Sequence, residues 1–329
     1  MEEELKIKTL EGLVVKGNRD TSILDSALRS QVNFEYSCKN GQCGVCKTTL
    51  LDGEVLMLQS QVALSDADIE AKKILTCCCA PISDILIDAE DLSELKNIEI
   101  KTLPARINKI EKKAEKIVEI DLRLPPKSNI AFLEGQYFDI IGPQGVRRSY
   151  SVASSASTQC LKFWIKEVEA GLLSQYWFND AKENDLLRIE GPKGSFFFKA
   201  PKKDIIFLAT GTGIAPIKAI LDKLCEAPDV VGNVNLTLYW GNRESSAFFW
   251  EPAYPALNLQ YIPVLSKINK AWTGRTGYIQ DNLISDTSDF SDAQIYASGS
   301  LNMIKAAKTL LVDNGLDRKH FYSDAFVSS

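Results

Sequence analysis

The chain has 329 residues, 45% of them hydrophobic and 25% charged, with a net charge of −5 at pH 7. This length suggests two or three domains, and the acidic balance argues against a nucleic-acid partner, which would require clustered Lys and Arg. No apolar run reaches the roughly 18 residues of a membrane-spanning helix, and the charged opening MEEELKIKTLEG lacks the apolar core of a signal peptide. We therefore expect a cytoplasmic protein that binds no membrane and keeps its eight cysteines reduced. His320 is the only histidine, which excludes His-rich metal sites.

The first predicted helix covers TSILDSALRS at residues 21–30 and precedes a dense group of cysteines. The stretch CKNGQCGVC has the spacing C-x4-C-x2-C, and LTCCCAP supplies further thiols about thirty residues later. This spacing with a distant fourth cysteine is typical of a plant-type [2Fe–2S] site, in which two bridged irons each need two thiolates. Glycines between the ligands permit left-handed backbone and bring N–H groups near the sulfurs. The predicted metal ligands are Cys38, Cys43, Cys46 and Cys77, with Cys78 and Cys79 as alternatives to Cys77.

Two other interpretations of these cysteines were weighed. A zinc site usually pairs two C-x2-C knuckles, and only one such knuckle is present here. Buried cysteines without a ligand role are the second alternative. We expect that structural role for Cys160 and Cys225, which lie outside the pattern and resemble small hydrophobic residues in their packing.

The stretch CKNGQCGVC followed by ILTC resembles the ferredoxin module of flavin-dependent iron–sulfur reductases. The resemblance covers residues 1–90 and implies a plant-type [2Fe–2S] ferredoxin domain of the β-grasp fold. The next segment, DAEDLSELKNIEIKTL, is acidic and poor in long apolar runs. We predict a linker over residues 91–103.

Residues 104–200 contain short alternating runs separated by Gly and Pro, which predict a small antiparallel β-barrel with one short helix near SQYWFNDA. The strand RRSYSVAS carries Arg148, Tyr150 and Ser151. An arginine can clamp a pyrophosphate, a tyrosine can stack on a flat ring, and a serine can hydrogen-bond a ring nitrogen. Gly171 and Ser174 then open a helix, where free N–H groups favour a phosphate. Taken alone, RRSYS could be an ordinary polar strand face, but this order of motifs, with EGPKGSF after them, favours a flavin site.

Residues 201–329 alternate between strands such as DIIFLAT and helices such as APIKAILDKLCEA, which predicts a parallel sheet covered on both faces. Gly211, Thr212 and Gly213 directly follow the first strand and precede a helix. Backbone at such a position can approach a dinucleotide phosphate closely. Gly241 and Arg243 are expected at the C-terminal edge of the next strand, although Arg243 could instead be a solvated surface charge.

These motifs resemble the ferredoxin–NADP reductase superfamily, and the resemblance implies an FAD-binding barrel and a nicotinamide-binding α/β domain. It implies the cofactor-binding residues Arg148, Ser149, Tyr150, Ser151, Lys166, Gly171, Leu173, Ser174, Gly211, Thr212, Gly213, Gly241, Arg243 and Gly299. It places four candidate catalytic residues beside the flavin and nicotinamide, namely Ser151, Ser298, Asp324 and Phe326. Ser298 stands where the superfamily normally has Cys, and a purely structural C-terminal strand is the alternative for Phe326.

A hydride donor gives two electrons at once whereas an iron–sulfur cluster accepts one, so a flavin must act between them. The stretches KILTCCCAPISD, RIEGPKGSFF, LYWGN, QYIPVLS and KHFYSDAF resemble the CDP-6-deoxy-Δ3,4-glucoseen reductases. This resemblance implies electron flow from NADH through FAD and the [2Fe–2S] cluster to CDP-4-dehydro-6-deoxyglucose 3-dehydrase, a pyridoxamine-phosphate (PMP)-dependent partner in 3,6-dideoxyhexose biosynthesis. The alternative is a reductase component of an aromatic-ring or phenol-type oxygenase. The resemblance implies NADH as the donor; no dense Arg/Lys cluster follows YWGNRES and Glu244 would repel a 2′-phosphate, but Arg243 leaves NADPH open.

Overall fold

The computed structural model describes residues 4–128, 130–158, 160–232, 234–267 and 271–327. It separates into two compact units, Met1–Ile98 and Glu99–Ser329. None of the helices in the described ranges is long and apolar enough to span a bilayer.

The first unit is a mixed five-stranded sheet with the strand order β2-β1-β7-β3-β5, beside a two-stranded sheet of β4 and β6. Its elements are β1 (Leu5–Thr9), β2 (Val14–Gly17), α1 (Ile23–Arg29), β3 (Lys47–Asp52), β4 (Val55–Met57), α2 (Asp66–Glu70), β5 (Lys73–Leu75), β6 (Cys79–Pro81), β7 (Ile85–Ile87) and a 3-10 turn (Ser93–Leu95). Strands β1 and β7 are parallel, whereas the other pairs in this unit are antiparallel. Ser22 caps α1 by accepting the Asp25 N–H, so the helix begins near the predicted position. A helix crossing a mixed sheet in this way is the β-grasp arrangement expected from the sequence.

The second unit begins with an antiparallel sheet whose strand order is β11-β10-β13-β8-β9-β12. Its elements are β8 (Lys101–Ala114), β9 (Ile117–Arg123), β10 (Tyr137–Ile141), a 3-10 turn (Pro143–Gly145), β11 (Arg147–Ser151), β12 (Cys160–Lys166), α3 (Leu172–Gln175), a π-helix (Tyr176–Asp180) and β13 (Leu186–Lys193). A bridge between Val152 and Phe163 joins the two edges, so the sheet closes into a barrel. Phe138, Ile120 and Phe163 are fully buried in its core. The predicted barrel and its helix are therefore present, although the helix is four residues of α-helix continued by a π-turn.

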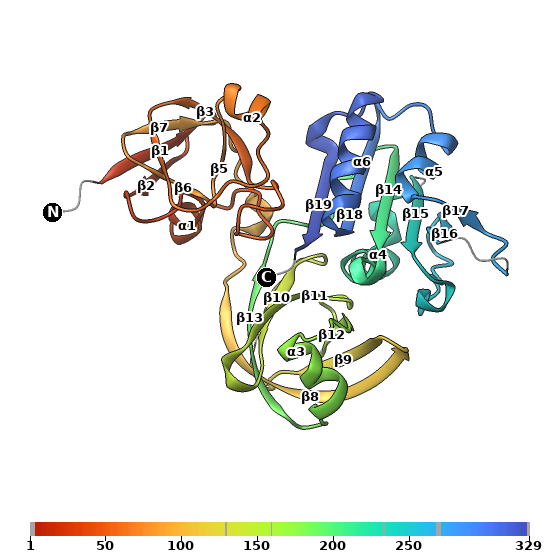
Figure 1. Cartoon of the computed structure of the whole chain (residues 1–329). Coiled ribbons are helices and arrows are strands. Elements are labelled where there is room, and N and C mark those ends of the chain that lie inside the picture. The colour runs from red at the N-terminus through yellow and green to blue at the C-terminus, as the bar shows by residue number, and fades with distance from the viewer. Residues whose placement is uncertain (1–3, 129, 159, 233, 268–270, 328–329) are drawn as a thin grey trace. The chain divides into compact units, whose positions relative to one another are not determined.

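The rest of the second unit is a parallel sheet with the order β17-β16-β15-β14-β18-β19, shown on the right in Figure 1. Its elements are β14 (Asp204–Thr210), a 3-10 turn (Gly211–Gly213), α4 (Ile214–Glu226), a 3-10 turn (Pro228–Val230), β15 (Asn235–Asn242), a 3-10 turn (Ser245–Ala247), β16 (Leu259–Leu265), β17 (Arg275–Thr276), α5 (Ile279–Asp286), β18 (Ala293–Ser300), α6 (Leu301–Asp313), a 3-10 turn (Arg318–His320) and β19 (Phe321–Phe326). The chain leaves β14 towards β15 but returns to β18 on its other side, so the strand order reverses at β14. Ligands of open parallel sheets bind at such a switch point, outside the carboxyl ends of the strands.

The predicted linker at 91–103 is divided between the two units. Leu92 and Leu95 are buried in the first unit, and the Leu92 N–H donates to the Asn33 carbonyl at 2.8 Å. The Asp91 carboxylate accepts the Asn33 N–H at 2.7 Å. Residues 101–103 already belong to β8. The connection is shorter than the composition indicated, because two leucines in an acidic stretch are enough to hold it on the first unit.

Candidate functional site

The cysteine loop of the first unit depends on glycine at two positions. Gly41 has φ +77° and Gly44 has φ +75°, a left-handed region that other residues adopt at a cost. A Cβ added to Gly41 would lie 2.2 Å from the carbonyl oxygen of Ser60. The loop therefore bends back tightly over the segment that follows β4, as expected for a loop that wraps a compact inorganic group.

The sulfurs of the four predicted ligands form two pairs. The Cys46 thiol donates to the Cys77 sulfur at 3.3 Å, across a gap of 31 residues in the sequence. The Cys43 thiol hydrogen-bonds Cys38, and the Cys43 N–H also approaches the Cys38 sulfur at 3.4 Å. Two pairs of thiols match the need of two bridged irons for two protein sulfurs each. Within the described ranges, no three His, Cys, Asp or Glu side chains are grouped to hold a single metal ion.

The electrostatics of the loop also fit thiolate ligands. The hydrogen bond from Cys43 lowers the pKa of Cys38 to about 5, helped by the backbone N–H groups of Asn40 and Gln42. The hydrogen bond from Cys46 lowers the pKa of Cys77 to about 7. Those same hydrogen bonds, together with burial, raise the pKa values of the donors Cys43 and Cys46. N–H groups directed at sulfur would also offset the negative charge of an iron–sulfur cluster.

The geometry favours Cys77 over its two neighbours as the fourth ligand. The Cys78 thiol donates to the Ser60 carbonyl at 3.6 Å, and burial raises its pKa. Cys79 lies on β6 opposite Met57, and burial raises its pKa to about 11. Only Cys77 pairs with Cys46. The sulfurs of Cys77 and Cys78 lie 3.5 Å apart, and we propose Cys77 as the ligand because its sulfur pairs with that of Cys46.

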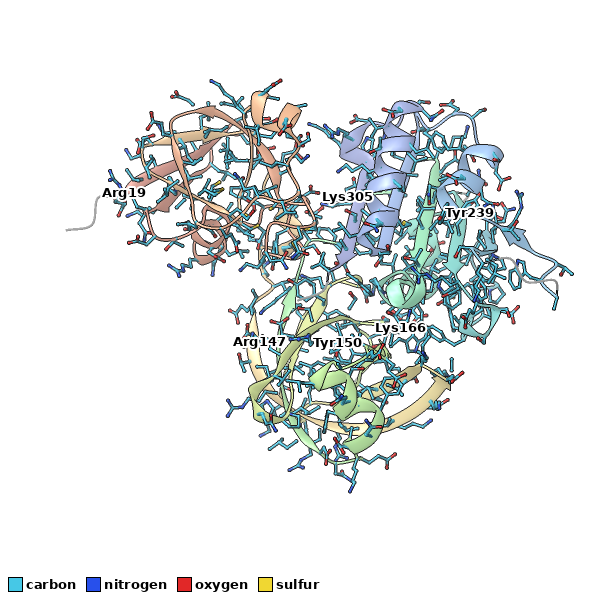
Figure 2. The ribbon with its side chains drawn as sticks, viewed as in Figure 1. Arg19, Arg147, Tyr150, Lys166, Tyr239 and Lys305 are labelled. Atoms are coloured by element: carbon cyan, nitrogen blue, oxygen red, sulfur yellow. The ribbon has the colours of Figure 1, made fainter. Side chains whose placement is uncertain are left out.

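The predicted flavin strand, β11, directs its side chains alternately to two faces. Tyr150 packs against the barrel core, and its hydroxyl accepts the Trp177 indole N–H at 3.3 Å. Burial raises the pKa of Tyr150 to about 12, so the ring remains neutral. The exposed Arg148 pairs with no carboxylate among the residues that the structure describes, which leaves its guanidinium available for a phosphate. Figure 2 labels Tyr150 and Arg147 in the upper part of the barrel, together with Lys166, which ends β12.

Charged side chains on the other face of β11 form a network that the sequence did not reveal. Arg147 binds both oxygens of Glu190 on β13 at 2.8 and 3.0 Å, and also donates to Asp139 on β10 at 3.0 Å. Lys193 contacts the same two carboxylates, and Ser149 donates to Asp139 at 2.6 Å. Burial alone would raise the pKa of Asp139, but these hydrogen bonds lower it below its ordinary value. The network joins three strands directly behind Arg148 and Tyr150.

The residues predicted for the adenylate half of FAD differ in their burial and in their contacts. Gly171 is the N-cap of α3, and Ser174 accepts the Val168 N–H at 2.7 Å while its own hydroxyl hydrogen remains able to donate. The side chain of Leu173 is buried against Gly142, where an added Cβ would lie 2.4 Å from it. Only the backbone of Leu173 can therefore serve a cofactor. Lys166 is exposed at the end of β12.

The glycine turn after β14 lies at the switch point of the parallel sheet. A Cβ on Gly213 would lie 2.4 Å from the Ser298 carbonyl, and one on Gly299 would lie 2.4 Å from the hydroxyl of Thr210. The two strand ends thus meet backbone to backbone. Gly211 has φ +56°, and open space surrounds its missing side chain. The Ile214 N–H already donates to the Gly211 carbonyl, so a pyrophosphate at this turn would be held by the positive end of the α4 dipole and by the remaining N–H groups of the turn.

Three of the four candidate catalytic residues are brought together from distant parts of the chain. The Ser151 hydroxyl donates to the Asp324 carboxylate at 2.8 Å. Asp324 lies opposite Ser298 in the register of β18 and β19. Ser298 is fully buried, and its hydroxyl has no hydrogen-bond partner among the described residues. Phe326 ends β19 and is 39% exposed, so it can contact a bound ring.

The edge of β15 carries the remaining predicted dinucleotide residues. A Cβ on Gly241 would lie 2.9 Å from Ile279, so glycine allows α5 to approach the strand. Arg243 is exposed just beyond β15. Glu244 is also exposed and lies 3.9 Å from the Lys267 ammonium group. Glu244 follows Arg243 in the sequence, so its negative charge would oppose a 2′-phosphate bound at Arg243, and the Lys267 ammonium group offsets part of that effect.

Each of the three predicted domains matches a known family model. Residues 9–82 match the model of the 2Fe-2S iron-sulfur cluster binding domain, residues 104–198 the oxidoreductase FAD-binding domain, and residues 207–309 the oxidoreductase NAD-binding domain. The CDP-6-deoxy-L-threo-D-glycero-4-hexulose-3-dehydrase reductase of Yersinia pseudotuberculosis serotype I (strain IP32953) is 39% identical over 97% of this chain and 97% of its own. This chain belongs to that reductase family. The family resemblance expected from the sequence is therefore confirmed, as are the FAD, nicotinamide and [2Fe–2S] cofactors.

Two further relatives of this reductase family define the breadth of the likeness. Reductase component 1 of terephthalate 1,2-dioxygenase from Comamonas sp is 29% identical over 94% of this chain and 93% of its own. The crystal structure of the Amycolatopsis cytochrome P450 reductase GcoB has a TM-score of 0.75 and 23% identity, and covers 98% of this chain and 99% of that one. At this identity the GcoB structure supports the fold alone.

Three features of this member of the dehydrase reductase family escaped the sequence analysis. The network around Asp139 and Glu190 was missed because its residues are spread over three strands. No sequence motif indicated that the Trp240 indole donates to the Gly211 carbonyl. Asn242 has a buried amide nitrogen without a partner among the described residues, immediately after Gly241. Polar residues that interrupt an apolar strand at its carboxyl end were the available signal for Asn242.

Proposed function

We propose that this protein is an NADH-dependent reductase that supplies electrons to CDP-4-dehydro-6-deoxyglucose 3-dehydrase, a PMP-dependent enzyme that removes the C-3 hydroxyl of a CDP-sugar. The observation that carries the proposal is the 39% identity to a reductase named for such a dehydrase, over 97% of both chains. Bound FAD takes up a hydride and releases electrons singly, which is the exchange that an iron–sulfur cluster requires.

Residues of the second unit would bind FAD and NADH, and residues of the first unit would bind the iron–sulfur cluster. Arg148 and the turn Gly211–Gly213 would bind the phosphates of FAD and NADH, respectively. Tyr150, held by Trp177, would orient the flavin ring. Ser151, paired with Asp324, would present a hydroxyl to the flavin edge. In the first unit, the two sulfur pairs would hold the cluster that passes electrons to the partner.

The test is a coupled assay with the purified holoprotein. Anaerobic NADH should bleach the flavin and iron–sulfur bands together, and NADPH should do so more slowly. Addition of the 3-dehydrase and CDP-4-dehydro-6-deoxyglucose should then yield a 3-deoxygenated sugar in amounts that match the NADH consumed. Rapid dye reduction without any 3-deoxygenated product would refute the proposed acceptor while leaving the reductase activity intact.

An oxygenase reductase is the second candidate, favoured by the 29% identity to the terephthalate dioxygenase component. It predicts dioxygen-dependent ring hydroxylation when the protein is mixed with an aromatic-ring oxygenase. The same preparation can be offered both acceptors, and the ratio of the two rates decides between them. A cytoplasmic location is part of our proposal, since none of the eight cysteines, all of them among the described residues, forms a disulfide.

A further inference from the structure

The indole of Trp240 binds the backbone of the dinucleotide turn. Trp240 lies on β15 and is fully buried, and its N–H donates to the Gly211 carbonyl at 2.9 Å. The same carbonyl accepts the N–H of Ile214, the first residue of α4. A side chain of the neighbouring strand and the start of the helix therefore fix one peptide group of the turn.

That peptide group matters because of its geometry. In a trans peptide the C=O and the following N–H point in opposite directions, so fixing the Gly211 carbonyl also fixes the Thr212 N–H. Gly211 has φ +56° and is conformationally free, so the turn without this restraint would sample other orientations. On the opposite side, Gly213 packs against Ser298 and Gly299. The turn is thus held from β15 by an indole N–H and from β18 by backbone contact.

Trp240 is itself held by an aromatic chain that reaches the flavin barrel. The rings of Phe248 and Phe249 meet Trp240 edge to face at 5.2 and 5.3 Å. Phe249 also meets Trp164 edge to face at 5.0 Å. Trp164 lies on β12 of the barrel and is 4% exposed. A continuous series of ring contacts therefore runs from the barrel through Phe249 and Trp240 to the Gly211 carbonyl.

We propose that Trp240 is a positioning residue for the nicotinamide dinucleotide. Its N–H orients the turn Gly211–Gly213 towards the pyrophosphate. Phe249 packs between Trp240 and Trp164 and so fixes the position of the indole relative to the flavin barrel. Trp240 does not touch the reacting atoms, so it acts on dinucleotide binding and not on electron transfer. This inference rests on the proposed oxidation of NADH.

The decisive variant is Trp240→Phe, which keeps an aromatic ring but removes the N–H. In holoprotein with ferricyanide as acceptor, KM for NADH should rise about five- to tenfold, with kcat within about twofold of wild type, because a lost hydrogen bond weakens binding by that factor. The dissociation constant of oxidised NAD⁺, measured by calorimetry, should rise equally, and FAD content should not change. Tyr239→Phe is the matched control, because it removes one buried hydrogen bond, from the Tyr239 hydroxyl to the Asp286 carboxylate, at the neighbouring position of β15.

The outcomes separate the possible failures. Unchanged KM and NAD⁺ affinity in folded, flavin-loaded Trp240→Phe would overturn the inference, as would equal losses in Tyr239→Phe. Phe249→Leu leaves the N–H bond in place and should raise KM about two- to threefold; an unchanged KM would overturn the link to the barrel. If Trp240→Phe does not fold, Phe249→Leu becomes the test of the whole inference, and an unchanged KM and NAD⁺ affinity in that variant would overturn it. Failure of wild-type protein to oxidise NADH would refute the proposed function instead.

Discussion

The hydroxyl of Ser151 donates to the carboxylate of Asp324 at 2.8 Å, although the two residues are 173 positions apart in the chain. Ser151 ends a strand of the flavin barrel, and Asp324 lies on the last strand of the nicotinamide sheet. Both are nearly inaccessible to solvent. The bond therefore ties β11 of the barrel to β19, the strand that carries Phe326, and supports our proposal that β19 contributes to the redox site.

Replacing Ser151 with alanine removes the donor to a buried carboxylate and the hydroxyl proposed to face the flavin. Hydrogen bonds to charged groups contribute about 1.5–3 kcal/mol, so flavin reduction by NADH should slow by about tenfold or more. Anaerobic stopped-flow absorbance measures this rate directly. Ser154→Ala is the control, since Ser154 is equally buried and donates to the Cys160 carbonyl instead. Equal slowing in both variants would show that general barrel damage is responsible.

The fourth iron ligand can be identified with two adjacent variants. Cys77→Ser should lose most of the iron and acid-labile sulfide, because Cys77 is the thiol that pairs with Cys46. Cys78→Ser should retain them, since its sulfur bonds the Ser60 carbonyl. Ferricyanide reduction by NADH should continue in both variants, because it requires only the flavin. Loss of iron from Cys78→Ser alone would transfer the ligand role to that residue.

Ser298 should respond to substitution in two separable ways. Its hydroxyl is fully buried without a partner among the described residues, so both Ser298→Ala and Ser298→Cys should stabilise the protein by about 1 kcal/mol in urea unfolding. Only Ser298→Cys restores the bulk and polarisability of sulfur beside Asp324, so it alone should accelerate flavin reduction. If the alanine variant is faster too, sulfur has no special role at this position.

The charge network of the barrel should produce a specific pH dependence. Hydrogen bonds from Arg147 and Lys193 lower the pKa of Glu190 to about 2, against an ordinary value of 4.5. A carboxylate whose folded pKa is depressed stabilises the protein above its unfolded pKa, and this contribution disappears as the pH falls through the folded pKa. Glu190→Gln should therefore cost about 1–2 kcal/mol at pH 7 and progressively less between pH 4.5 and 2.

Denaturant titrations at several pH values measure that difference. Glu111→Gln is a suitable control, because Glu111 also pairs with two lysines but on an exposed surface. Its effect should be smaller and should fade with added salt. A constant difference between wild type and Glu190→Gln from pH 7 to pH 2 would contradict the role of the Glu190 charge.

The parts of the site that depend on local spacing could be predicted from the sequence. The cysteine loop is fixed by C-x4-C-x2-C with its two glycines, and the turn Gly211–Gly213 by its place between an apolar strand and a helix. Both motifs are contained within a dozen residues, so their geometry follows from neighbouring positions alone. The parallel sheet itself also follows from the alternation of strands and helices, whereas the reversal of its strand order at β14 does not.

Contacts between distant strands could not be predicted. Nothing local indicates that Ser151 meets Asp324, or that Arg147 binds Glu190 across the barrel. The packing of the Leu173 side chain beside Gly142 could not be predicted either, and it limits the predicted cofactor role of Leu173 to its backbone. Such pairings depend on how the sheets close, which short motifs do not specify.

The proximity of the Cys46 and Cys77 sulfurs, 3.3 Å apart, has a consequence for anyone who handles the purified protein. Once iron is lost in air, these two thiols are placed to oxidise to each other, and Cys77 is the more readily ionised nucleophile. A disulfide between Cys46 and Cys77 would remove two of the four proposed cluster ligands, so iron and sulfide could not be bound again. Reconstitution should therefore succeed only from thoroughly reduced, oxygen-free apoprotein. An aged sample that stays yellow would be a protein that has kept its flavin but in which Cys46 and Cys77 are joined by a disulfide.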